Sequence, residues 1–326
     1  MKKINYYLIL LITIGISCSI VYAVDFYCTS REVSYDNSNS GLISDNVQDA
    51  LDELFNCASS YNSINENVIE LLNITEENAG FHNAIFRGKN ITDYYMDGTL
   101  YTRISNGTFN DLYIGDYIVQ NGINWRIAGF DIYLKKGDNA FMTHHAVIIP
   151  DTGLTSARMN SSDTTIGGYV GSEMYTVTLP NVLETYINPV FGSHVLEYRN
   201  LLSNSMDNTR ANRTSFINGA ASDWGWYTRK LDLMNEVQVF GTIAWSSSGI
   251  EVGSDNTQFP LFRLRPIYIN VQRNCYWLRN IVSETHFVDV ELDGFTGLYG
   301  ASLTNNTFTN QAFGVRPYFY TSILII

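Results

Sequence analysis

The sequence predicts an α+β protein in which antiparallel strands dominate and helices are few and short. The 326 residues are 45% hydrophobic and 16% charged, which is the composition of a folded chain with a sizeable core. The content of 22 Tyr and 24 Gly against 6 Pro favours short strands joined by polar turns. From Phe86 onward, the spacing of apolar residues changes from a helical period to the period of two that strands require.

The charge balance bears on the class of partner. The net charge is −12, and the 20 Lys and Arg residues show no local cluster along the chain. A phosphate-binding surface needs such a cluster. We therefore expect no nucleic-acid partner.

The N-terminal residues 1–24 have the pattern of an export signal. Lys2 and Lys3 precede an apolar run from Tyr6 to Val24, which ends on a small-x-small cleavage pattern. A run of this length also suffices for an uncleaved membrane anchor. Lipidation at Cys18 is a minor alternative, because the usual leucine before such a cysteine is missing. In each case we expect an extracytoplasmic protein, either secreted or anchored on the cell surface.

Residues 25–85 are expected to form a linker and a helical stalk. Apolar residues from Val47 to Phe55 recur at the spacing of one helical face, and a second stretch over 64–75 repeats the spacing. Both segments are too short to be stable helices alone in water. They either pack on each other or on the main domain, or they form an oligomerising stalk that gives a homo-oligomer.

The cysteines are too few for a disulfide scaffold, so the fold must rest on its core. Cys28 and Cys57 flank the first expected helix and form a candidate disulfide. Cys275 lies in an apolar, aromatic stretch and is expected to be a buried thiol.

Residues 86–326 are expected to form a β-rich head domain. Its clearest local signal is Asn121-Gly122 between two alternating apolar runs, which predicts a β-hairpin. Helices are expected over Ser172–Tyr175 and Pro180–Asn188, with Pro189 ending the second. The further expected strands are Ala146–Ile149, Val237–Trp245, Ile267–Val271, Tyr276–Arg279, Phe287–Leu292 and Gly314–Ile326.

Catalytic and metal-binding motifs are weak in this chain. It has no Gly-x-Ser-x-Gly elbow and no His-x-x-x-His pair, so neither a hydrolase triad nor a zinc site is supported. Alternation places Asp289, Glu291 and Asp293 on one strand face, where their oxygens would suit calcium, although a solvated strand face is the simpler interpretation. We expect no cofactor, with calcium as the alternative.

Aromatic residues beside amide and hydroxyl groups are the better functional signal. Trp224, Trp226 and Tyr227 follow Asp223 in a short segment around Gly225, and Trp245 lies further along the chain. Such aromatics suit stacking on sugar rings. We therefore take these residues as the candidate ligand-binding site, on aromatic loops. The alternative is that the rings belong to an ordinary core.

Two C-terminal motifs, Tyr276-Trp277-Leu278-Arg279 and Gly314-Val315-Arg316-Pro317-Tyr318-Phe319, resemble the closing pattern of an uncharacterised domain family. That family is common in Gram-positive gut bacteria and their phages, and its motifs are similar to those of formylglycine-generating-enzyme and C-type-lectin-like folds. The resemblance implies a C-type-lectin-like head. Its structural signature residues here are Trp277, Arg279, Gly314, Arg316 and Pro317. Both arginines would need buried partners, and Gly314 would permit a tight approach before the last strand.

Several other segments between residues 41 and 172 resemble phage tail or head-fibre proteins of the same group. The export signal departs from that pattern, since virion components fold in the host cytoplasm. A phage-like bacterial surface protein fits better. Formylglycine-type oxidase chemistry needs a pair of cysteines in the C-terminal domain, and only Cys275 is present there. That activity is excluded.

These observations lead to one main functional expectation and two alternatives. We expect a non-enzymatic extracytoplasmic surface or phage-tail-like protein whose lectin-like head binds a cell-surface glycan or protein. An uncleaved N-terminal segment would also contact the membrane. The first alternative is a secreted enzyme that acts on cell-wall or host polysaccharide, and the second is a structural part of a virion or envelope.

Overall fold

The computed structural model describes residues 34, 36, 38, 43–44, 46–53, 78–211, 218–246, 256–304 and 312–322. The chain divides into two compact units, Met1–Glu76 and Glu77–Ile326. Within the described residues, no helix is both long and apolar enough to cross a membrane. The expected signal or anchor over 1–24 lies outside them, as do Cys28 and Cys57.

The first unit contains a helix over 47–53, which confirms part of the expected helical region. Its N-terminus is capped by Asn46, whose side chain accepts a hydrogen bond from the backbone N–H of Asp49 at 2.9 Å. At the other end of this helix, the Glu53 carboxylate accepts hydrogen bonds from Ser44 and from the backbone N–H of Ile43. These contacts lower the pKa of Glu53. The second expected helix, over 64–75, lies outside the described residues.

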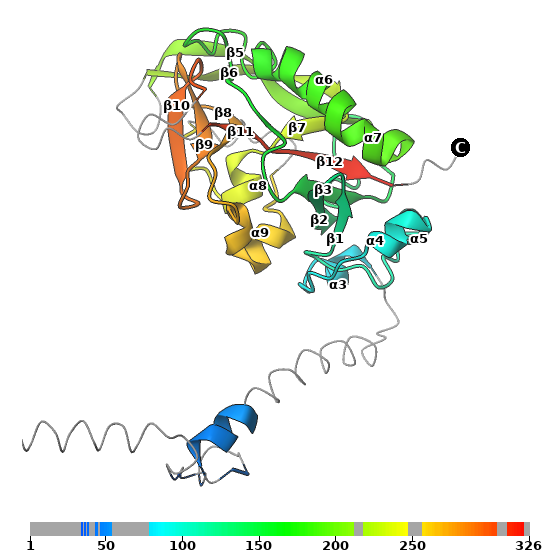
Figure 1. The fold of residues 1–326 in the computed structure, drawn as a ribbon. Helices are drawn as coiled ribbons and strands as arrows, with labels where there is room; N and C mark the ends of the chain where they lie inside the picture. The colour runs from blue at the N-terminus through cyan, green and yellow to red at the C-terminus, as the bar shows by residue number, and fades with distance from the viewer. Residues whose placement is uncertain are drawn as a thin grey trace, which may run out of the picture. The chain divides into compact units, whose positions relative to one another are not determined.

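The second unit is a mixed α+β structure, as expected, with mostly antiparallel strands and short helices (Figure 1). Its described strands form two five-stranded sheets and a separate two-stranded one. The first sheet has the order β1-β2-β3-β12-β7, formed by β1 Tyr117–Gln120, β2 Ile123–Phe130, β3 Ala146–Pro150, β12 Pro317–Thr321 and β7 Leu231–Leu233. The second has the order β10-β9-β8-β11-β4, formed by β10 Thr296–Gly300, β9 His286–Val290, β8 Tyr276–Ile281, β11 Gly314–Val315 and β4 Thr155–Ser156.

The hairpin expected at Asn121-Gly122 is confirmed. Strands β1 and β2 pair antiparallel, and Gln120 lies opposite Ile123. Both turn residues have positive φ, 53° at Asn121 and 75° at Gly122, as a tight hairpin turn of this handedness requires. The strands expected around Ala146, Tyr276, Phe287 and Gly314 are also present.

The third sheet is a long hairpin that the sequence did not predict. Strand β5 covers Tyr198–Ala211 and strand β6 covers Asn218–Arg229, and the two pair only with each other among the described strands. Register shifts between Ser203 and Ser205 mark a bulge. In Figure 1, this ribbon lies beside the helical segment labelled α6 and α7.

Helical structure runs from Met174 to Phe191 and alternates between two geometries. The π-helical segments are η1 Met174–Thr178 and η2 Leu183–Ile187, and the α-helical segments are α6 Leu179–Val182 and α7 Asn188–Phe191. Each α segment carries a proline in its first turn, and proline removes one backbone donor from the helical ladder. The helix continues through Pro189 and ends at Gly192, so the expected stop at Pro189 is wrong.

Two expected strands are helices instead. The region Val237–Trp245 begins as α8, Glu236–Phe240, because Asn235 and Gln238 form a capping box at its start. The region Ile267–Val271 begins as the 3₁₀ helix η5, Pro266–Ile269, which follows α9 Pro260–Leu264. Proline in the first turn suits both of these last two helices. The remaining helices are α3 Ala79–His82, α4 Thr92–Met96, α5 Thr99–Ser105 and η3 Gly192–His194.

The head begins before residue 86, where it was expected to start. Asn83 exchanges two hydrogen bonds of 2.8 Å with the backbone of Phe130 on β2. The His82 ring is buried, and its Nδ1 lies 2.6 Å from the carbonyl oxygen of Leu112. The segment around α3 is therefore part of the second unit.

The five signature residues occupy buried positions near the junction of the two large sheets. Trp277 is fully buried and stacks on Phe313, and Arg279 donates to the carbonyl of Leu233 at 3.3 Å. Arg316 donates to three backbone carbonyls, as a buried arginine requires. Pro317 begins β12, where a missing N–H costs least.

Gly314 permits a close approach between strand β11 and the loop that joins β3 to β4, as expected. A Cβ atom on Gly314 would lie 3.3 Å from the Cα of Gly153, and a Cβ on Gly153 would lie 2.9 Å from the Cα of Gly314. Cys275, just before β8, is fully buried, which confirms that expectation.

Candidate functional site

The candidate tryptophans lie on strand β6 rather than on a loop, which corrects the expectation of aromatic binding loops. Trp224 and Trp226 are two residues apart and therefore share one face of the ribbon. Trp224 pairs with Ser203 across the ribbon, and Trp226 pairs with Leu201. Both indoles are half-buried, so each leaves part of its ring accessible.

The two indoles differ in their packing against the hydrophobic core. Trp224 packs against the hydrophobic core, and its indole Nε1 is shielded without a hydrogen-bond partner. The carboxamide Oδ1 of Asn204, in the bulge of β5, is likewise buried and unpartnered. Buried polar atoms of this kind are uncommon in folded proteins. The ribbon thus carries one unused donor and one unused acceptor.

Tyr227 lies on the opposite face of the ribbon from the two tryptophans. Its ring packs edge-on to Tyr175, next to Arg229, whose guanidinium lies 3.7 Å above the Tyr175 ring. A Cβ on Gly225 would lie 2.9 Å from the Tyr227 ring and 3.2 Å from Asn204 Nδ2. Gly225 therefore allows an aromatic ring and an amide to lie together over the strand, and Tyr227 belongs to the packing of that face.

Asp223 is exposed at the bulged part of β6, where it follows Ser222. Trp245 lies elsewhere, in the loop after α8, and its Nε1 donates to the carbonyl of Thr296 on β10 at 3.2 Å. The Glu236 carboxylate accepts hydrogen bonds from the backbone of residues 244–246 and so holds this loop. Trp245 is thus separate in the fold from the other four candidates, which the ribbon brings together.

A second unusual group is Asp289 on β9. Its side chain is fully buried, and neither carboxylate oxygen has a hydrogen-bond partner. A Cβ on Gly297, its partner on β10, would lie 2.7 Å from Asp289 Oδ1 and 2.5 Å from Glu291 Oε1. The two carboxyl groups therefore share the space that glycine leaves. Burial, together with the charge of Glu291, raises the pKa of Asp289 to about 8.

The third calcium candidate, Asp293, does not join this pair. Strand β9 ends at Val290, and Asp293 is exposed in the following turn, where its Oδ1 accepts a 3.0 Å hydrogen bond from the Phe295 N–H. Alternation therefore does not extend to Asp293. Over the described part of the chain, no three His, Cys, Asp or Glu side chains gather as a metal site would require.

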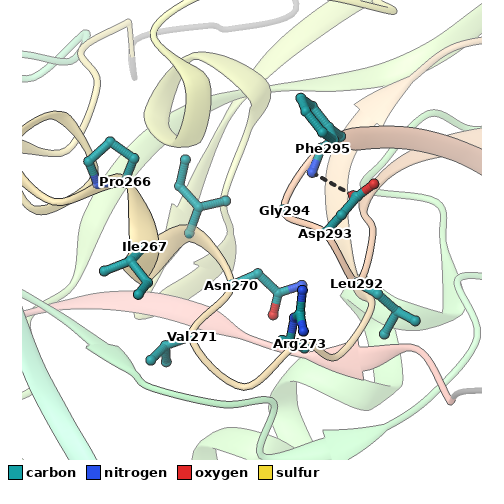
Figure 2. Close-up of a pocket in the computed structure, with 10 residues that line it drawn as sticks. Pro266, Ile267, Asn270, Val271, Arg273, Leu292, Asp293, Gly294 and Phe295 are labelled. Carbon is teal, nitrogen blue, oxygen red and sulfur yellow. Dashed lines mark hydrogen bonds between the residues drawn. The ribbon is translucent and has the colours of Figure 1, made fainter. Parts of the chain in front are cut away.

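A cavity of about 500 Å³ lies between η5 with its following loop and the turn that joins β9 to β10 (Figure 2). This cavity was not predictable from the sequence, because Ile267–Val271 has the apolar pattern of a strand. Its apolar wall includes Ile267 and Phe295, which are 69% and 72% exposed. The polar lining is Asn270, Arg273 and Asp293.

Three side-chain hydrogen bonds hold the walls of this cavity. Arg316, one of the signature residues, donates to the carbonyls of Tyr268 and Ile269 at 3.1 and 2.7 Å. Asn270 Nδ2 donates to the carbonyl of Glu291 at 2.5 Å and so joins the η5 loop to the β9–β10 turn. These hydrogen bonds fix the η5 loop and the β9–β10 turn relative to each other. The cavity is therefore not a gap between independent loops.

The two adjacent histidines of the sequence share Asp131. His144 Nδ1 lies 2.6 Å from Asp131 Oδ2, and the backbone N–H of His145 donates to Asp131 Oδ1 at 2.9 Å. Burial lowers the pKa of His145 to about 4, so its ring is neutral at neutral pH. These contacts fix the loop before β3, which is a structural role.

In comparisons with known proteins, no protein-family model, curated protein or solved structure matches this chain.

Proposed function

We propose that residues 77–326 form a non-enzymatic, lectin-like head that binds a glycan on the face of the β5–β6 ribbon carrying Trp224 and Trp226. The protein would act outside the cytoplasm, on a cell surface or on a phage-like tail, with the N-terminal unit linking the head to its support. A C-type-lectin-like arrangement of the head is part of this proposal. Its support is the mostly antiparallel α+β structure and the buried signature residues.

The observation that carries the proposal is the pair of partly exposed indoles on one strand face. Residues i and i+2 of a strand stand side by side on that face, at a spacing of roughly 6–7 Å along the strand. Indole faces stack on the apolar C–H face of a sugar ring, while their edges remain available for hydrogen bonds. A row of two indoles therefore suits a chain of sugars better than a single small ligand.

The test is binding of the full-length chain to a glycan array and to intact Gram-positive cells, with Trp226→Ala as the main variant. We expect saturable binding by the unmodified protein and a loss of about tenfold or more in the variant, since truncating a central Trp of a binding interface commonly costs about 2 kcal/mol or more. Phe295→Ala is the control, because it removes an exposed aromatic ring from the cavity beside η5 and leaves the ribbon intact. Binding that survives Trp226→Ala unchanged would exclude the ribbon.

Trp224→Ala serves as a second variant with a different expectation. Because Trp224 packs against the core, its removal should lower the melting temperature as well as the affinity. Thermal unfolding of both variants separates the two effects. A Trp226→Ala protein that unfolds like the Trp224→Ala protein would show that both rings are core residues.

The enzyme alternative has one observation in its favour, the Asp289–Glu291 pair. Glycoside hydrolysis uses a protonated carboxyl group near an ionised one, and the raised pKa of Asp289 matches the first requirement. However, Asp289 has no exposed surface from which to reach a substrate. Release of soluble sugar from the bound glycan, abolished by Asp289→Asn, would establish the enzyme and overturn the proposal of a pure binder.

A further inference from the structure

The cavity beside η5 has the features of a ligand site that is independent of the tryptophan ribbon. Its volume of about 500 Å³ falls within the range that small-molecule sites occupy, about 300–1,000 Å³. Ile267 and Phe295 leave most of their surface exposed at this cavity although both side chains are large and apolar. Exposed apolar side chains that converge on one concave surface are a recognised mark of binding sites.

Arg273 supplies the charge of this cavity. Its side chain is exposed, and its guanidinium has no hydrogen bond or ion pair with any part of the described chain. The backbone at Arg273 has φ +53°, a left-handed conformation that is unfavourable for a residue with a Cβ. Backbone strain of this kind is concentrated at functional positions. The free guanidinium offers a planar, two-pronged donor that matches a carboxylate.

The other polar groups of the cavity narrow the chemical class of the ligand further. Both functional atoms of the Asn270 side chain are already used, since its Nδ2 donates to Glu291 and its Oδ1 accepts from the Asn274 N–H. Asp293 keeps Oδ2 for a ligand, because the turn uses Oδ1. A dianion such as a phosphate monoester would be opposed by this carboxylate. A ligand with one negative charge and one N–H donor suits Arg273 and Asp293 together.

We propose that this cavity binds the C-terminal residue of a peptide whose last side chain is large and apolar. The terminal carboxylate pairs with Arg273, the apolar side chain lies between Ile267 and Phe295, and the preceding amide N–H donates to Asp293. The chemical unit that the cavity would recognise is an acylated apolar amino acid, which carries a carboxylate, an apolar group and an N–H donor close together.

The experiment is isothermal titration of the full-length chain with N-acetyl-L-phenylalanine, with N-acetyl-L-phenylalaninamide and with octanoate. We expect saturable binding of the acid and binding that is about tenfold or more weaker for the uncharged amide, because a charge-assisted hydrogen bond is lost. Octanoate has the charge and the apolar group but lacks the N–H. Octanoate that binds as tightly as the amino acid would overturn the peptide assignment.

Variants of the cavity and matched controls decide whether binding occurs at this place. Arg273→Gln and Phe295→Ala should each weaken binding of the acid by about tenfold or more. Arg158→Gln makes the same charge change in an exposed ion pair with Glu173, and should have no effect. Trp226→Ala should also have none, which separates this site from the proposed glycan site. No saturable binding of the acid, or equal binding by the Arg273→Gln protein, would overturn the proposal.

Discussion

At the scale of single residues, Asp289 is the clearest departure from ordinary protein chemistry. A carboxyl group that is fully buried and has no donor beside it is stable only in its protonated form. Glu291 increases the cost of ionisation because its carboxylate shares the space over Gly297. The folded protein therefore holds a proton at Asp289 that the unfolded chain releases near pH 4.

This difference predicts how the stability of Asp289→Asn compares with that of the unmodified protein. The pKa of Asp289 is raised on folding, to about 8, so the folded state binds more protons between pH 4 and pH 8, and stability falls as pH rises through this window. The slope is about 1.4 kcal/mol per pH unit at most. Asparagine does not titrate. The variant should match the unmodified protein near pH 4 and become increasingly more stable toward pH 8.

Denaturant unfolding at pH 4, 6 and 8 measures that difference directly. Subtracting the two proteins removes the titration of other groups, such as His145. Two stability curves that stay parallel from pH 4 to pH 8 would contradict the assignment. Repeating the series with calcium tests the alternative that these carboxylates bind calcium. A bound cation would stabilise ionised Asp289, and would therefore raise the stability of the unmodified protein but not of the variant.

At the scale of elements, short capping motifs decide between helix and strand where apolar spacing is ambiguous. The region Val237–Trp245 has a strand-like apolar pattern, yet Asn235 and Gln238 satisfy each other's backbone N–H groups and start α8. Gly241 then ends the helix in a left-handed conformation. The capping box outweighs the apolar pattern here, because it supplies hydrogen-bond partners for N–H groups that have none within the helix.

Replacement of Asn235 tests this explanation. Asn235→Ala removes the acceptor for the Gln238 N–H and should lower the free energy of unfolding by about 1–2 kcal/mol. Asn235→Ser keeps a capping oxygen and should retain most of the stability. Urea denaturation of both variants gives the comparison. Equal stability of the alanine and serine variants would show that packing alone maintains α8.

The same local competition explains which parts of the fold followed from the sequence. The hairpin at Asn121-Gly122 and the helix after Pro180 carry turn and cap signals within a few residues, and both were predictable. The β5–β6 ribbon was not, since its pairing joins residues up to 31 apart in sequence, as Tyr198 and Arg229 are. Its strands are also rich in Asn, Ser and Gly, which mark turns rather than strands.

The candidate site followed from the sequence only in part. Residue type identified the tryptophan segment, and alternation identified Asp289 with Glu291. The isolation of Trp245 depends on the loop after α8, and the cavity depends on contacts of Arg316 and Asn270 with distant segments. Such contacts have no local signature in the chain.

At the scale of the whole molecule, the boundary of the head is the feature most open to a direct test. A fragment covering residues 77–326 contains every described contact of the second unit and should unfold cooperatively at the same temperature as the head in the full chain. A fragment beginning at Phe86 lacks the hydrogen bonds of Asn83 and the buried ring of His82. It should be less stable by about 2 kcal/mol or more.

Differential scanning calorimetry of the two fragments and the full chain gives this comparison. Equal melting temperatures for the two fragments would place the boundary at Phe86 and reduce the segment around α3 to a peripheral attachment. A fragment 77–326 that fails to fold would show that the N-terminal unit contributes to the stability of the head.

The placement of the two last strands has a consequence for how the protein is made. Strand β11 lies between β8 and β4, and strand β12 lies between β3 and β7, so both large sheets are interrupted until residues 314–321 arrive. A growing chain therefore carries open strand edges in both sheets until these residues have been made. Neither sheet can close before then, so complete folding of the head has to wait for residues 314–321, although most of its strands are made much earlier.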